Sequence, residues 1–342
     1  MTPLQILQAA MQGTPAPRIP IFCNLLDQGA QLLKLSPKAF FANGEYVAEA
    51  QLRLLQEYGH DNVWSLHYVG KEAELLGCQE ILFAEHGVPN VANFVLQQVE
   101  DIANFTIPAD ITQHPAWESI ASCLRILKAE VGATHPICAY VTASTTLPAL
   151  LLGMDKWMEL YLTGPFELRD HLLRLCSDFT QQHLAALRAA GANVLIYSSP
   201  FGSPYFLSKA QIAKDILPWM LRDLQGEQRR DLVYYCGMAP FNDIIELVME
   251  ELQITTHYIS PLADLATAKR LINTRGLTCG VIDDIKMINW SEQQTREEVK
   301  RIIDIGKPGG HFLFGTGVMP MAIPTVNIHA MLSAAHEYGA LS

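Results

Sequence analysis

The sequence predicts an α/β protein, a closed (β/α)8 barrel, on the basis of three observations. Short apolar, β-branched or aromatic runs bounded by Gly, Pro or Asn recur along all 342 residues. Longer segments with helical spacing of apolar residues lie between them. The apolar runs are continuous rather than alternating, which is typical of parallel strands covered on both faces. Eight such strand–helix units without a Gly/Ser-rich linker favour a single barrel domain over residues 1–342.

The predicted strands are short apolar runs that end at turn-forming or polar residues. In chain order they are Arg18–Cys23, Asp61–Leu66, Pro136–Val141, Asn193–Ser198, Asp231–Cys236, Gln253–His257, Leu277–Asp283 and His311–Gly315. The interval between the second and third strands is too long for one helix. We therefore expect an excursion around residues 79–115.

The predicted helices occupy the intervals that follow the strands. Ser208 and Ser291 are expected N-caps, because a serine hydroxyl accepts a hydrogen bond from a free amide of the first turn. The helices are Tyr46–Tyr58, Ala116–Val131, Pro165–Ala190, Ser208–Gln225, Phe241–Glu251, Leu262–Asn273, Ser291–Ile305 and Thr325–Tyr338.

A doubly wound open sheet is the alternative fold for this order of elements. Such a sheet is expected to bind a nucleotide at a Gly-rich turn after its first strand. The segment Cys23–Gly29 reads CNLLDQG and has no GxGxxG or Walker pattern. The barrel is therefore favoured.

Composition and charge exclude several classes of protein. With 49% hydrophobic and 17% charged residues the chain is globular, and its net charge of -11 disfavours a nucleic-acid partner. The longest apolar runs, such as Thr145–Met154, are about half as long as the roughly 20 residues of a membrane span, so no membrane partner is expected. The 7 cysteines show no CxxC spacing and the N-terminus has no signal-peptide pattern, which indicates a cytoplasmic protein.

The candidate site residues lie near the predicted strand ends, because the carboxyl ends of barrel strands form the mouth where chemistry occurs. They are Asn24, His67, Tyr68, Thr142, Ser199, Cys236, His257, Asp283, Asp284 and Thr316. This predicted rim is polar and carries few charges.

Histidines and acids are the candidates for proton transfer at this mouth. His67 directly follows a strand, so it can exchange a proton or bind a metal, or it can be hydrogen-bonded under a loop. His257 ends a later strand and has the same alternatives. Asp283 and Asp284 are adjacent, so they face opposite sides of a strand and only one can point into the mouth. One of them is expected to act there or to cap the next helix.

Two further features have alternative interpretations. Cys236 can be a thiolate ligand or nucleophile, or a small buried apolar residue. The segment Gly315-Thr316-Gly317 follows the last predicted strand, where its amides can bind an anion or its glycines can simply turn the chain.

Several of these segments together resemble the uroporphyrinogen decarboxylase superfamily, which contains the tetrapyrrole decarboxylases and the MtaA/CmuA-type cobalamin methyltransferases. The similar segments are RIPIF at Arg18–Phe22, KEAELLG at Lys71–Gly77 with Cys78 after it, Thr145–Leu151, Ser199–Trp219, Tyr235-Cys236-Gly237 and GGHFLFGTGVMP at Gly309–Pro320. The resemblance implies a (β/α)8 barrel and a homodimer.

Compared with the decarboxylases, the chain lacks the arginines that follow the first strand and hold substrate carboxylates. The family's aspartate after the second strand falls near His67 or Tyr68, its tyrosine matches Leu150, and its histidine in the last loop matches Thr316. Only its serine is retained, as Ser199. A porphyrinogen with eight carboxylates needs compensating cations, so this difference disfavours decarboxylase activity.

Compared with the methyltransferases, the chain retains one of three zinc ligands. The resemblance places the family's His-x-Cys pair at Tyr234 and Cys236 and its last cysteine at Thr316. One ligand cannot hold zinc tightly.

The leading hypothesis is a corrinoid-linked one-carbon transferase with a degenerate zinc site. His67 or the inward aspartate would be the general acid or base, Tyr68 and Ser199 would orient the substrate, and the corrinoid would be a substrate or be bound to a partner protein. Uroporphyrinogen decarboxylation with rearranged carboxylate contacts, and a barrel that only binds a tetrapyrrole or corrinoid, are the alternatives.

Overall fold

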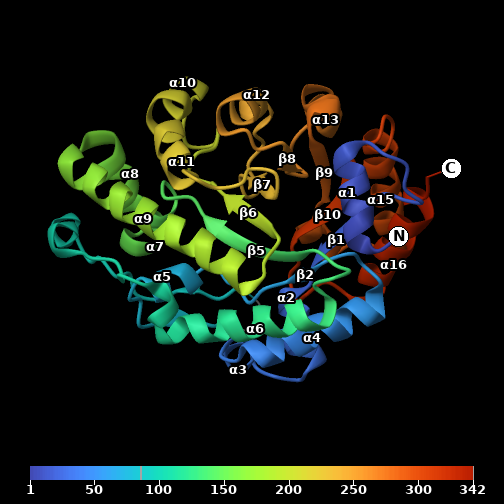
Figure 1. Cartoon of the computed structure of the whole chain (residues 1–342), viewed down its shortest axis with the longest axis horizontal. Helices are drawn as coiled ribbons and strands as arrows, with labels where there is room; N and C mark the ends of the chain where they lie inside the picture. The colour runs from blue at the N-terminus through green and yellow to red at the C-terminus, as the bar shows by residue number, and fades with distance from the viewer. Residues whose placement is uncertain (85–86, 342) are drawn as a thin grey trace.

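Eight parallel strands surrounded by helices form the barrel that the sequence predicts (Figure 1). The computed structural model describes residues 1–84 and 87–341. Neighbouring strands follow the order β1-β10-β9-β8-β7-β6-β5-β2. Their bounds are Ile21–Asn24 for β1, Val63–Trp64 for β2, Ile137–Thr142 for β5, Val194–Ser198 for β6, Leu232–Tyr235 for β7, Thr256–Ile259 for β8, Leu277–Ile282 for β9 and Phe312–Val318 for β10.

Each of the eight predicted helices overlaps a helical segment of the structure. These segments are α4 (Gly44–Tyr58), α6 (Pro115–Val131), α9 (Phe166–Ala190), α10 to α11 (Lys209–Gln211 and Leu217–Asp223, joined by a π-helical segment), α12 (Ile245–Leu247, continued by a π-helical segment to Leu252), α13 (Leu265–Ile272), α15 (Glu292–Gly306) and α16 (Thr325–Gly339). Ser208 and Ser291 cap their helices as expected, each in a capping box.

Several shorter helices have no counterpart in the prediction. They are α1 (Pro3–Gln12), α2 (Leu26–Leu32), α3 (Pro37–Phe41), α5 (Lys71–Leu75), α7 (Leu147–Leu152), α8 (Met154–Thr163) and α14 (Asp284–Met287). The interval after β2 contains α5, an antiparallel hairpin of β3 (Ile81–Leu82) and β4 (Asn90–Val91), and two 3-10 turns. No helix in the described part of the chain is long and apolar enough to cross a membrane.

Side chains close the barrel between β1 and β2, where the two strands share no backbone ladder. The Asp61 carboxylate accepts from the amide of Ile21 at 2.7 Å and from both terminal nitrogens of Arg18 at 2.5 and 2.6 Å. The Asn62 side-chain oxygen accepts from the Cys23 amide at 2.9 Å. The two side chains therefore accept the hydrogen bonds of the Ile21 and Cys23 amides, which carbonyls of a neighbouring strand would accept in a regular sheet.

Two strands, β8 and β10, end two or more residues later than the sequence predicts. The β8 strand begins at Thr256 because Gln253 adopts a left-handed conformation (φ 57°) that ends the preceding helical segment. His257 is therefore the second residue of its strand and not the last. The β10 strand continues to Val318, so Gly315-Thr316-Gly317 lies within a strand and is not the anion-binding turn that was one of its expected roles.

A layer of tyrosines fills the barrel interior. Tyr140 of β5 contacts Tyr235 of β7 with ring centroids 6.2 Å apart, although β6 separates the two strands. Contact between strands that are not neighbours requires both rings to point inward. Tyr235 in turn contacts Tyr258 of β8 at 6.1 Å. Tyr235 is the last residue of β7 and reaches the mouth, whereas Tyr140 and Tyr258 lie deeper in the barrel.

Candidate active site at the barrel mouth

A cavity of about 360 Å³ lies at the carboxyl ends of the strands. We call it the mouth cavity. Tyr235, the last residue of β7, and Asp284, which follows β9, contribute to its wall, together with Asp27 from α2. A smaller space of about 30 Å³ adjoins it, shares Asp27 as a lining residue and is also lined by His67. Together with Val318 at the end of β10, the mouth therefore collects groups from five strand ends.

Asp284 is a buried carboxyl in this cavity. Burial, together with the negative charge of Asp283, raises the pKa of Asp284 to about 7. Its Oδ2 atom has no hydrogen-bond partner among the described residues. Gly317 of β10 leaves room for it, because a Cβ atom at position 317 would lie 2.7 Å from that oxygen. A carboxyl that changes protonation near neutral pH suits general acid or base catalysis.

Asp27 is a second buried carboxyl that lines the mouth cavity. It is the second residue of α2, is 5% exposed, and has its pKa raised to about 7 by burial. Asn24 is the site residue predicted at this strand end, and Asp27 is not among the predicted site residues. Its acidic side chain close behind a predicted strand was the available signal, but nothing in the sequence showed that it would be buried.

His67 lies at the edge of the mouth as a neutral imidazole. Its ring stacks on Tyr140 with centroids 4.7 Å apart, and burial lowers the pKa of His67 to about 4. Asn24 donates through Nδ2 to the Tyr140 hydroxyl at 3.4 Å. His67 and Asn24 are thus connected through one tyrosine, and His67 is placed to orient or accept rather than to carry charge.

Asp283 and Thr316 have structural contacts instead of facing the cavity. The Asp283 carboxylate caps α14 by accepting from the Lys286 amide at 3.0 Å and pairs with the Lys286 ammonium at 2.9 Å. The Thr316 hydroxyl accepts from the Asn24 amide at 2.9 Å and so joins β10 to β1.

Tyr68 and Thr142 are held by a neighbouring helix, α5. The Tyr68 hydroxyl donates to Glu74 at 2.5 Å, and the same carboxylate pairs with the buried Lys71 ammonium at 2.9 Å. The Thr142 amide donates to Glu72 at 2.8 Å. The Tyr68 hydroxyl is therefore engaged on the side of α5, although its ring lines the smaller space beside the mouth.

Ser199, Cys236 and His257 lie away from the cavity. Ser199 is fully buried. A Cβ atom added to Gly202 would lie only 2.7 Å from the Ser199 hydroxyl oxygen, so this hydroxyl packs under the loop that follows β6. His257 is fully buried beside Phe241 and Tyr234. Because Tyr258 points into the barrel, its neighbour His257 faces the outer helices.

The donor set does not fit a zinc ion. The Cys236 sulfur lies 3.5 Å from the Tyr234 hydroxyl, and burial raises the pKa of Cys236 to about 12. Within residues 1–84 and 87–341 no group of three His, Cys, Asp or Glu residues could hold a metal ion. A neutral thiol beside a phenol is not a thiolate ligand, so these residues do not provide a zinc site.

Comparisons with known proteins agree with this architecture. The family model described as uroporphyrinogen decarboxylase (URO-D) matches residues 2–338. Among solved structures, a methyltransferase from Methanosarcina mazei has a TM-score of 0.84 at 19% identity and covers 99% of this chain and 100% of its own. A putative vitamin-B12-independent methionine synthase from Listeria monocytogenes has a TM-score of 0.57 at 11% identity and covers 95% and 97%. At these identities the solved structures show a shared fold. No curated protein matches the sequence.

Proposed function

Because the chain belongs to the uroporphyrinogen decarboxylase family, we propose that it is an enzyme that transfers a one-carbon (methyl) group at the barrel mouth, with a corrinoid as the methyl carrier. The observation that carries the proposal is the mouth cavity: two buried carboxyls line it, and no lysine or arginine is among its described lining residues. Such a site suits an uncharged or cationic substrate.

The same observation disfavours the decarboxylase alternative. A porphyrinogen brings many carboxylates, and each buried carboxylate needs a cation or several hydrogen-bond donors. Asp27 and Asp284 supply no such cation, and in their ionised forms they would repel it. The overall net charge of -11 points in the same direction.

Asp284 is assigned the role of general acid. As the bond between the methyl group and its heteroatom breaks, the bonding electron pair would stay on the heteroatom, which would take the carboxylic proton of Asp284. Asp27 completes the acidic wall, and His67 orients the substrate. When bound, a corrinoid supplies the cobalt centre that carries the methyl group.

The rim of the mouth cavity fits an uncharged macrocycle better than a polyanion. Val69, Val88, Ile285, Val318 and Met321 line it with apolar surface. We propose that a corrinoid protein presents its cofactor against these side chains. The proposal also includes a single domain over residues 1–342, a cytoplasmic location and a homodimer.

The test is a methyl-transfer assay with free cobalamin as the probe. The protein is incubated with cob(I)alamin and a panel of N-methyl and O-methyl compounds, and methylcobalamin is measured by its absorbance. We expect transfer with at least one compound and a loss of about 100-fold or more in Asp284→Asn, because a general acid contributes about that much.

Asp304→Asn is the matched control, because Asp304 is an exposed aspartate on the outer helix α15. It should retain wild-type activity. Equal activity in Asp284→Asn and wild type would contradict the assigned role. Loss of a carboxylate from uroporphyrinogen III, with no methyl transfer to cobalamin, would favour the decarboxylase instead.

A further inference from the structure

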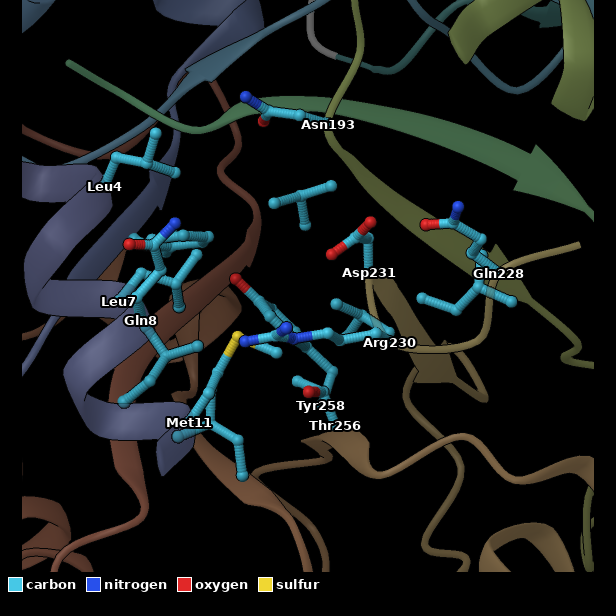
Figure 2. A pocket seen from close by; sticks show the side chains of 16 residues that line it. Leu4, Leu7, Gln8, Met11, Asn193, Gln228, Arg230, Asp231, Thr256 and Tyr258 are labelled. Carbon is cyan, nitrogen blue, oxygen red and sulfur yellow. The ribbon is translucent and has the colours of Figure 1, made fainter. Parts of the chain in front are cut away.

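A second cavity, of about 340 Å³, lies at the opposite end of the barrel. We call it the floor cavity (Figure 2). Residues at the starts of β6, β7 and β8 line it, and helix α1 closes one side with Leu4, Leu7 and Met11. Its volume falls within the range of small-molecule sites. None of the described residues that line the mouth cavity lines the floor cavity.

The inward-facing side chains at the starts of β6, β7 and β8 are small, which leaves space for the floor cavity on that side of the barrel. Val194, Val233 and Thr256 occupy this layer, which lies below Tyr258. Barrels usually fill each interior layer with bulky side chains. Here the first helix covers the space without filling it, and the wall combines an apolar part, formed by residues such as Leu7, Val233 and Leu313, with polar side chains at the opening.

Arg230 is the cation at this cavity. It is exposed and has no ion pair among the residues that the structure describes. The neighbouring acid, Asp231, lies 3.7 Å from Arg188 and is therefore partly neutralised. Figure 2 shows the Arg230 guanidinium directed from the β6–β7 side toward α1, over the apolar wall. An unpaired guanidinium beside an apolar hollow suits an anion with an apolar body.

We propose that the floor cavity binds a small carboxylic acid with an apolar chain. The carboxylate would pair with Arg230 at the opening, and the chain would lie against Leu7, Val233 and Leu313. Gln8 and Gln228, which line the same opening, can donate further hydrogen bonds. This binding site is independent of the reaction proposed for the mouth.

Calorimetric titration with octanoate tests the proposal, with octanamide as the uncharged probe. We expect saturable binding of octanoate at one site per chain. Arg230→Gln should weaken octanoate binding about tenfold and leave octanamide binding unchanged, because a charge-assisted pair is lost only for the acid. Arg174→Gln is the matched control, since Arg174 is an exposed arginine on α9 and does not line the cavity.

Met11→Trp fills the cavity from α1 and should weaken the binding of both octanoate and octanamide. Thermal unfolding is used to confirm that the variant is folded. Arg230→Gln changes an exposed residue and provides the test that does not depend on packing. The proposal is wrong if octanoate shows no saturable binding to the wild type. It is also wrong if the two arginine variants behave alike, or if folded Met11→Trp binds octanoate as the wild type does.

Discussion

Asp283 and Asp284 show how one step along the backbone separates two roles. Asp283 accepts the Lys286 amide and pairs with its ammonium, whereas Asp284 faces the mouth cavity with an oxygen that lacks a hydrogen-bond partner among the described residues. Alternation along the strand end predicts this division but not its direction. The structure supplies the direction through Gly317, which leaves space on the side where Asp284 lies.

Burying Asp284 makes stability depend on pH. Its pKa in the folded state is about 7, above its ordinary value of 3.8, so the native state binds the proton more tightly than the unfolded state. The contribution of Asp284 to stability is therefore greatest at low pH and falls as pH rises from about 4 to about 7.

Asp284→Asn should remove this contribution. At about pH 8 we expect its free energy of unfolding to exceed that of the wild type by about 1 to 3 kcal/mol, and the difference should shrink toward about pH 5. Urea unfolding at both pH values measures it. Asp304→Asn should follow the wild type, and an Asp284→Asn variant less stable than wild type at about pH 8 would show that the buried carboxylate makes stabilising contacts that an asparagine cannot replace.

At the scale of elements, the junction between β1 and β2 depends on side chains. Asp61 is fully buried and accepts hydrogen bonds from Arg18 and from the Ile21 amide. Removing one partner of a buried charge pair leaves the other unpaired, which costs more than losing an exposed pair.

Asp61→Ala should lower the free energy of unfolding by about 3 to 5 kcal/mol, because it leaves the mostly buried Arg18 guanidinium without its carboxylate and the Ile21 amide without its acceptor. Chemical denaturation provides the measurement. The control is Glu298→Ala, which removes a 2.6 Å pair with Arg301 on the surface of α15 and should change stability by about 0.5 kcal/mol or less. Similar losses in the two variants would mean that the Asp61 carboxylate is not what holds the β1–β2 junction.

The strands could be predicted from the sequence because a parallel barrel buries both faces of each strand, which gives continuous apolar runs. Strand ends could not. The β8 strand is displaced because Gln253 adopts a left-handed conformation, which its side chain does not reveal. The β10 strand continues through two glycines, which usually indicate a turn, because inward positions 315 and 317 are crowded by Tyr258 and Asp284. The displaced end of β8 explains why the sequence pattern places His257 at the mouth, whereas the structure places it on the outer side of the strand.

The prediction of site residues depends on the exact strand ends more than the prediction of the fold does. A shift of one residue turns a side chain from the mouth to the outer helices. Asp27 illustrates a different difficulty, since its burial depends on α2, a helix of 7 residues that has no amphipathic signature of its own. Long-range contacts, not local pattern, determine which acids become titratable near neutral pH.

At the scale of the whole molecule, the barrel separates two chemically different ends. The mouth has two acids and no described cation among its lining residues, whereas the floor cavity has Arg230 beside an apolar wall. Figure 1 shows α1 on the side of the barrel near β10 and β1, and its residues Leu4, Leu7 and Met11 line the floor cavity but not the mouth cavity. A substrate and a second ligand could therefore occupy the chain at once.

The pH dependence of methyl transfer tests the acid role of Asp284 in the whole enzyme. A general acid acts in its protonated form, so the rate should fall as pH rises through about 7. Asp283 contributes to the raised pKa of Asp284 through its negative charge. Asp283→Asn keeps a capping side chain but removes that charge, so it should move the fall in rate to lower pH. A rate that rises with pH through about 7 would instead make Asp284 a base, and a profile unmoved by Asp283→Asn would assign the titration to Asp27.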